Sequence, residues 1–171
     1  DLIEAIETAE TLPLTTTITL APNCTYTLTA VYDADPDGYG AVGLPPINTP
    51  LVIVGNGATI VRSEGADPFR FFYVNTTGSL ALQQLHLKSG YMQGGDGARY
   101  DSQGGAGGGA AGMGGAIFNR GTLRLEQSTL LDNQAVGGDG GCTSSGSPSS
   151  GNPGGGGGGL GGDAVNNLGG G

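Results

Sequence analysis

The 171-residue sequence has no tryptophan, one histidine, two cysteines and only six lysines and arginines together. A surface that binds nucleic acid needs clustered basic side chains, so scattered ones among 15 acidic residues exclude that class of partner. Zinc sites need closely spaced cysteine or histidine pairs, whereas Cys24 and Cys142 lie far apart. No apolar run approaches the roughly 20 residues of a membrane-spanning helix, so we expect no transmembrane segment.

The composition favours an extracellular location. Lysine is scarce, threonine and asparagine are frequent, and the net charge is −9. This balance is typical of a secreted or cell-surface protein, and cysteines in such compartments often pair. One hypothesis is therefore a disulfide between Cys24 and Cys142. The alternative is two separate thiols.

The first residues predict a helix. Leu2, Ile6 and Ala9 recur at helical spacing, and the Asp1 side chain can cap the first turn. We expect a short capping α-helix within residues 1–12. Beyond it, short runs rich in threonine, isoleucine and leucine alternate in polarity and are bounded by turn residues, which predicts strands.

Two leucine-bearing segments repeat each other at an offset of 43 positions, 78–87 and 121–130. Leucine falls on leucine at three places: Leu80 on Leu123, Leu82 on Leu125, and Leu87 on Leu130. Repeated short strands with fixed corners are typical of a solenoid whose turns stack to bury a shared apolar column. We therefore predict an all-β fold, with parallel β-helix coils over 13–136, in which these two segments lie as adjacent strands.

Glycine occupies 37 positions and is concentrated after residue 90. We interpret 94–115 and 137–162 as glycine-rich insertions, and 163–171 as the start of a further coil or an assembly segment. Composition alone predicts flexible linkers, because glycine loses the most entropy on ordering. Our hypothesis is extended glycine strands packed against each other, the flank of the coils or a neighbouring chain.

One acidic loop resembles a calcium site in its spacing. Asp33, Asp35, Asp37 and Gly38 match the first half of a calcium-binding loop, in which alternate carboxylates converge on one cation. Leu44 stands where a bidentate glutamate would be needed. A calcium site and a solvated acidic turn are the two interpretations, and no other cofactor is indicated.

Carbohydrate-cleaving enzymes also use parallel β-helices, and their chemistry needs clustered carboxylates or calcium with a basic proton acceptor. The candidates here are Asp33, Asp35, Asp37, Arg62 and Arg70. No two acids recur with facing spacing and the arginines are isolated, so we expect no enzymatic activity. His86 matches Thr129 in the repeat, which indicates a surface position.

Asparagine and aromatic side chains leave further alternatives open. Asn119, Asn133 and Asn167 can form side-chain ladders between coils, or can be ordinary turn residues. The aromatic group at 69–73 can expose a strip that holds sugars or a partner protein, or can stack inside the coil.

Six segments occur in an order and with a content shared by a known group of proteins: 1–6, 17–22, 24–29, 43–47, 53–60 and 114–123. Together they resemble right-handed parallel β-helix proteins of the polymorphic outer membrane protein type, a kind of bacterial surface adhesin. The resemblance implies a secreted or surface-displayed bacterial protein with adhesive or structural roles. Members of this type carry many more coils, which implies that this chain is a fragment or a processed subunit.

The function that we expect is a non-enzymatic extracellular structural or adhesive protein. The N-terminal helix would cover one end of the coils, whereas the other end has no evident cap and invites stacking. We therefore expect neighbouring copies of the chain as partners in a surface filament, with a cell-surface glycan or protein as a further partner. The alternatives are a polysaccharide lyase or hydrolase and a calcium-stabilised binding module.

Overall fold

The computed structural model describes residues 1–98 and 107–141, which consist mostly of strands with one α-helix. The α-helix is α1 (Leu2–Glu10), and a single 3₁₀ turn, η1, spans Pro36–Gly38. The strands are β1 (Thr16–Thr19), β2 (Thr25–Leu28), β3 (Pro50–Arg62), β4 (Phe72–Val74), β5 (Ser79–Lys88), β6 (Tyr91–Gln93), β7 (Ile117–Asn119), β8 (Thr122–Glu126), β9 (Thr129–Leu131) and β10 (Gln134–Val136). The expected all-β class is confirmed.

The chain forms two compact units. The first contains Asp1–Pro36, Ala41–Met92 and Gly114–Gln134. The second contains Asp37–Gly40 and the glycine-rich segments that follow Met92 and Gln134.

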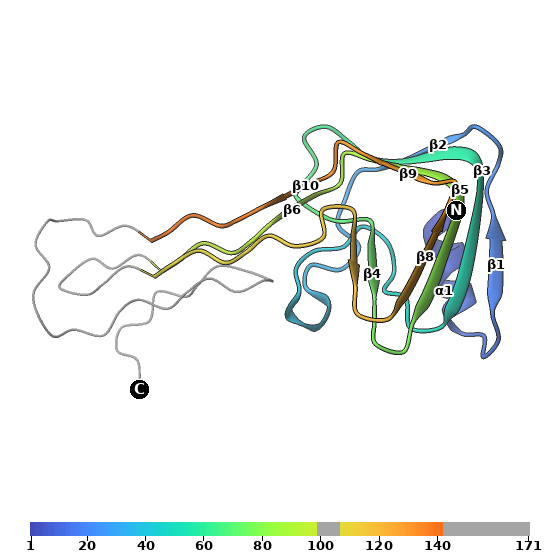
Figure 1. Cartoon of the computed structure of the whole chain (residues 1–171), viewed down its shortest axis with the longest axis horizontal. Coiled ribbons are helices and arrows are strands. Elements are labelled where there is room, and N and C mark those ends of the chain that lie inside the picture. The colour runs from blue at the N-terminus through green and yellow to red at the C-terminus, as the bar shows by residue number, and fades with distance from the viewer. Residues whose placement is uncertain (99–106, 142–171) are drawn as a thin grey trace, which may run out of the picture. The chain divides into compact units, whose positions relative to one another are not determined.

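The main sheet of the first unit is parallel, with the strand order β1-β3-β5-β8 (Figure 1). β2 also pairs with β3, and β9 also pairs with β5. Leu80 lies opposite Leu123, and Leu87 lies opposite Leu130, so the predicted adjacency of the two leucine segments is confirmed. A second, two-stranded parallel sheet joins β4 to β7, and β6 pairs with β10.

Apolar columns run through the stacked strands. Ile18, Ile53, Leu82 and Leu125 are successive partners across β1, β3, β5 and β8. Within β5, Leu80, Leu82, Leu85 and Leu87 are buried. The residues between them are more exposed, because successive side chains of a strand point to opposite faces. We call β7, β8 and β9 the terminal layer, since β8 ends the strand order.

The aromatic residues at 69–73 complete this core. Phe69, Phe71, Phe72 and Tyr73 are each at most 1% exposed. The stacked interior arrangement is therefore confirmed, and the alternative of an exposed aromatic strip is wrong. Arg70, which lies between Phe69 and Phe71, is also only 1% exposed, so both faces of this segment are covered.

The strands of the main sheet bend at residues with positive φ. Asn23, Asn56, Gln84 and Gln127 have φ values of 55°, 50°, 50° and 48°. The bends are linked across layers, because Gln84 Nε2 donates to Gln127 Oε1 at 3.1 Å and Asn56 Nδ2 donates to the Leu20 carbonyl at 3.1 Å. A left-handed conformation is uncommon for glutamine, so the sequence does not indicate this corner.

The predicted N-terminal helix is present as α1. The Asp1 carboxylate accepts a hydrogen bond from the Ile3 amide at 2.8 Å, which satisfies a free donor of the first turn. Leu2, Ile6 and Ala9 are buried in the core. Glu10 accepts hydrogen bonds from the Asn48 amide and the Thr49 hydroxyl at 2.8 and 3.1 Å. The helix is thus held both by its apolar stripe and by its last turn.

In the second unit, three glycine-rich segments run side by side: 93–98, 107–113 and 135–141 (Figure 1). Their amides donate at every third position, to carbonyl oxygens 2.8–3.2 Å away: Gly94 to Val136, Gly97 to Asp139, Gly107 to Ala98, Ala110 to Gly95, Gly138 to Ala110, and Gly141 to Gly107. A Cβ added at Gly94 or Gly141 would overlap a neighbouring carbonyl oxygen. The expected close packing of the glycine-rich segments against each other is borne out here, although 94–98, 107–113 and 137–141 contain no β-strand. Residues 99–106 and 142–171, among them the expected further coil or assembly segment at 163–171, lie outside the described residues.

Candidate functional site

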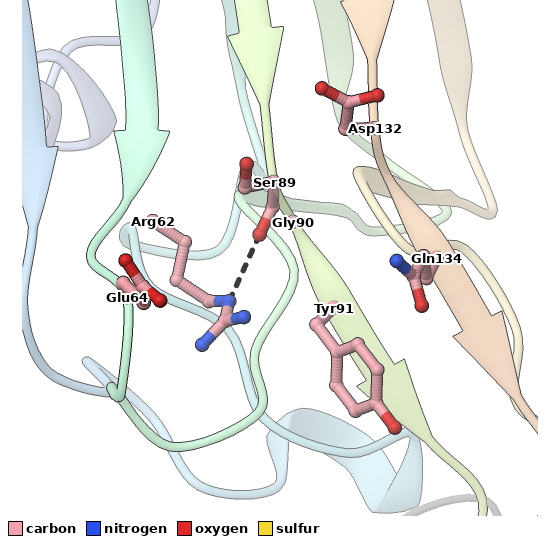
Figure 2. Close-up of a pocket in the computed structure, with 7 residues that line it drawn as sticks. All are labelled: Arg62, Glu64, Ser89, Gly90, Tyr91, Asp132 and Gln134. Atoms are coloured by element: carbon pink, nitrogen blue, oxygen red, sulfur yellow. Dashed lines mark hydrogen bonds between the residues drawn. The ribbon is translucent and has the colours of Figure 1, made fainter.

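A groove of about 300 Å³ crosses one corner of the first unit (Figure 2). Arg62 ends β3, Ser89 follows β5, and Asp132 follows β9. Because Val61 pairs with Lys88 and Lys88 pairs with Leu131, these three positions lie in consecutive layers. The residues that line the groove are Arg62, Glu64, Ser89, Gly90, Tyr91, Asp132 and Gln134.

Arg62 is held by four contacts on one side of this groove. Its Nε donates to the Ser89 carbonyl at 2.9 Å, and its Nη1 donates to the Ala66 carbonyl at 2.6 Å. Its Cζ lies 6.0 Å from the ring centroid of Phe69 and 5.7 Å from that of Tyr91. A guanidinium so placed has cation–π contacts with both rings and a fixed orientation. It is a donor and not a proton acceptor.

The other polar side chains of the groove are exposed or half-exposed and are not bonded to other side chains of the described residues. In the part of the chain that the structure describes, Glu64, Ser89, Tyr91, Asp132 and Gln134 make no side-chain hydrogen bond or ion pair. Figure 2 shows Tyr91 between Arg62 on one side and Gln134 on the other. The groove therefore presents two carboxylates, two hydroxyls and an amide without partners in the described chain.

The terminal layer forms a second candidate surface. Leu125 and Leu130 are 42% and 44% exposed, whereas their partners Leu82 and Leu87 in β5 are fully buried. A hollow of about 440 Å³ lies over this layer. The residues that line it are Gly114, Gly115, Ala116, Ile117, Leu123, Leu125, Leu130, Asp132 and Asn133. No strand of the described chain pairs with the outer edge of β8.

The acidic loop makes a local turn. Asp33 Oδ1 accepts a hydrogen bond from the Asp35 amide at 3.1 Å, and the Asp33 backbone pairs with Val42. Asp37, with φ of 56°, belongs to the second unit. Among residues 1–98 and 107–141, no group of three acidic, histidine or cysteine side chains is placed to hold a metal ion. Calcium binding by Asp33, Asp35 and Asp37 stays a prediction.

Arg70 is a core residue, which the sequence does not reveal. It is 1% exposed, its Nε donates to the Gly114 carbonyl at 3.3 Å, and its Cζ lies 5.2 Å from the Phe118 ring centroid. Burial lowers the pKa of the Arg70 guanidinium to about 10, against the opposing effect of the Asp35 charge. Arg70 is therefore still a cation at neutral pH.

The remaining sequence candidates are spread over the first unit. Cys24 is exposed at the start of β2, and Cys142 lies outside the described residues, so their disulfide stays a prediction. His86 is half-buried and pairs with Thr129, on the opposite face of β5 from Leu85 and Leu87, as its expected surface position requires.

Of the expected ladder asparagines, Asn133 connects two layers and Asn119 does not, whereas a side-chain bond between layers joins a different pair, with Asn75 Nδ2 donating to Asn48 Oδ1 at 3.0 Å. Asn119 Oδ1 accepts from the Gly121 amide at 3.1 Å, a bond within its own turn. Asn133 bridges two layers, since its Oδ1 accepts from the Gly90 amide at 2.8 Å and its Nδ2 donates to the Leu87 carbonyl at 3.0 Å. Its partners are backbone groups, so it is not part of a side-chain ladder. Asn167 lies outside the described residues.

The described residues contain no helix with the length and apolar character that a membrane crossing requires. A scan of the chain against protein-family models found no match, and searches of curated proteins and of solved structures found none either.

Proposed function

We propose that this chain is a right-handed parallel β-helix that acts outside the cell as a non-enzymatic structural or adhesive protein. Its order of strands supports this proposal. The chain passes from β3 through β4 to β5, and then through β7 to β8, while β3, β5 and β8 pair in parallel and β4 pairs with β7. Crossovers between parallel strands of one sheet are right-handed in almost all proteins.

The second part of the proposal is that copies of the chain assemble through the terminal layer. The observation that supports it is the exposure of leucines in this layer. Leu125 and Leu130 are 42% and 44% exposed, whereas their partners in β5, Leu82 and Leu87, are fully buried. Full burial of a leucine is worth about 1.5–3 kcal/mol, so covering each of these half-exposed side chains would contribute about 1 kcal/mol. The outer edge of β8, which no strand of the described residues pairs with, would supply backbone hydrogen bonds to the added layer.

The two ends of the strand order differ, and this limits the kind of assembly. α1 packs on β1, at the opposite end from β8, and buries Leu2, Ile6 and Ala9 there. An unlimited filament needs two complementary faces on each subunit, whereas one open face joins two copies. We therefore propose that two copies, which can themselves be parts of a larger surface structure, meet through their terminal layers.

The absence of enzymatic activity is also a proposal. Arg62 and Arg70, the basic candidates for a lyase, hold backbone carbonyls and aromatic rings as cations. The described acidic residues form no metal-binding group. A screen for released reducing or unsaturated sugars tests this part, and release by the purified protein would contradict it.

Sedimentation velocity over a range of protein concentrations tests the assembly. We expect a concentration-dependent dimer, and we expect Leu125→Asp combined with Leu130→Asp to give a monomer with an unchanged circular dichroism spectrum. Leu14→Asp is the matched control, because Leu14 is 76% exposed and lies outside the terminal layer. A wild-type protein that stays monomeric at all concentrations would contradict the proposal, as would a dimer that the double variant leaves intact.

A further inference from the structure

The groove at Arg62 combines solvent-accessible polar groups with an aromatic ring, Tyr91, that Arg62 contacts. Five of its side chains have no partner in the described chain, and they include acceptors (Glu64 and Asp132) and groups that both donate and accept (Ser89, Tyr91 and Gln134). A sugar hydroxyl also donates one hydrogen bond and accepts two. It therefore matches every one of these groups without the need for a particular charge.

The charges of the groove exclude anionic ligands. The lining contains two carboxylates, Glu64 and Asp132, and a single guanidinium, and Arg62 already uses its Nε and Nη1 for backbone carbonyls. The whole chain carries a net charge of −9. A uronate polymer or a nucleic acid would meet repulsion here, because like charges across an interface are unfavourable.

The shape of the groove suits an extended chain. Its lining spans consecutive layers at Arg62, Ser89 and Asp132, and strands of a sheet lie about 4.8 Å apart, so the groove extends about 10 Å along the stack. Arg62 lies over the Tyr91 ring, and Figure 2 shows the Tyr91 hydroxyl directed away from Arg62. An aromatic ring with a polar tip can pack on the apolar face of a sugar and bind its hydroxyls.

The backbone at the centre of the groove is held closely. The Gly90 backbone lies against its neighbours so closely that an added Cβ would approach Phe71 and the Gly115 carbonyl. The backbone N–H of Gln134 donates to the Gly90 carbonyl at 2.9 Å. A preformed site loses less entropy when it binds a ligand.

From this geometry we propose that the groove binds an uncharged glycan chain. The inference rests on the adhesive role proposed above and names its partner class. It uses side chains other than the exposed leucines of the terminal layer. A protein partner fits the groove less well, because the centre of a protein interface is usually apolar and this lining is polar.

Native affinity electrophoresis of the purified 171-residue protein tests the proposal. The gels contain dextran, galactomannan or hydroxyethyl cellulose as uncharged polymers, or polygalacturonate as an anionic one, and mobility is compared with that of serum albumin. We expect at least a twofold loss of relative mobility with one or more uncharged polymers and none with polygalacturonate. Tyr91→Ala and Asp132→Asn should restore normal mobility, whereas Tyr32→Ala, at an exposed tyrosine outside the groove, should not.

Three results would overturn the proposal: unchanged mobility with all three uncharged polymers, equal or greater retardation by polygalacturonate, or retardation that persists in both groove variants. Asp132→Asn keeps the shape of an exposed side chain, so it stays informative even if Tyr91→Ala weakens the fold. The Leu125→Asp and Leu130→Asp double variant separates the two proposals. It should lose dimerisation and keep retardation by the glycan.

Discussion

Truncation of Leu82 and of Leu125 to alanine tests how the stacked layers are stabilised. The two residues are partners in adjacent strands, but Leu82 is fully buried and Leu125 is 42% exposed. A buried leucine truncated to alanine costs about 2–5 kcal/mol, because transfer energy is lost and a cavity remains. Leu125 loses a little over half of the transfer energy and leaves no closed cavity, so we expect a cost of about 1 kcal/mol.

Urea unfolding followed by far-ultraviolet circular dichroism measures both costs. With an m-value of roughly 2 kcal/mol per molar, Leu82→Ala should lower the midpoint by about 1–2.5 M and Leu125→Ala by about 0.5 M. The measurement is made at a protein concentration where the chain is monomeric. Equal losses for the two variants under that condition would refute the view that the terminal layer is uncovered.

The same pair of variants reports on association. At concentrations where two copies meet through the terminal layer, Leu125 becomes buried, and the cost of Leu125→Ala should rise toward that of Leu82→Ala. The Leu82→Ala cost should not depend on concentration. A concentration-independent difference would contradict assembly through Leu125.

Three further predictions concern local structure. Gly94→Ala should destabilise the packing of the glycine segments by about 1–3 kcal/mol, because its Cβ would overlap the Ala110 carbonyl, whereas the Cβ of Gly108→Ala meets open space and should have no effect. Amide exchange at Gly97 and Gly141 should therefore be faster in Gly94→Ala than in Gly108→Ala, and equal exchange rates in the two variants would contradict the packing. Asp1→Ala should cost about 1 kcal/mol in thermal unfolding through loss of the helix cap, and an unchanged melting temperature would argue against that cap. Gln84→Val should lower the free energy of unfolding by about 1–3 kcal/mol more than Gln84→Gly, because a β-branched residue is strained at φ of 50°. Comparable urea midpoints for the two variants would refute this corner geometry.

The pairing register of β5 with β8 could be predicted because the sequences of the two strands repeat each other. Leu80 and Leu123 occupy equivalent places in two segments, and equivalent residues of stacked strands pair directly. The N-terminal helix could be predicted for a similar reason. The spacing of Leu2, Ile6 and Ala9 and the cap at Asp1 are local features, and local features are visible along the chain.

The groove could not be predicted in this way. Arg62 and Asp132 are far apart in the sequence, and they come together because three successive strands end at the same corner. The only signal was the repeat itself, which places Ser89 and Asp132 at the same offset as the leucines. Arg70 gave no signal of burial, because a charged residue is buried only where particular carbonyls and rings surround it.

By itself, the sequence determined the strand class, the leucine columns, the N-terminal helix and the glycine-rich character of the second unit, since each depends on the spacing of neighbouring residues. The tertiary structure alone decided which aromatic rings are buried, where the strands bend, and which leucines stay exposed in the terminal layer. These features depend on contacts between distant residues. The same leucine is buried at position 82 and exposed at position 125 because one has a layer above it in the described chain and the other has none.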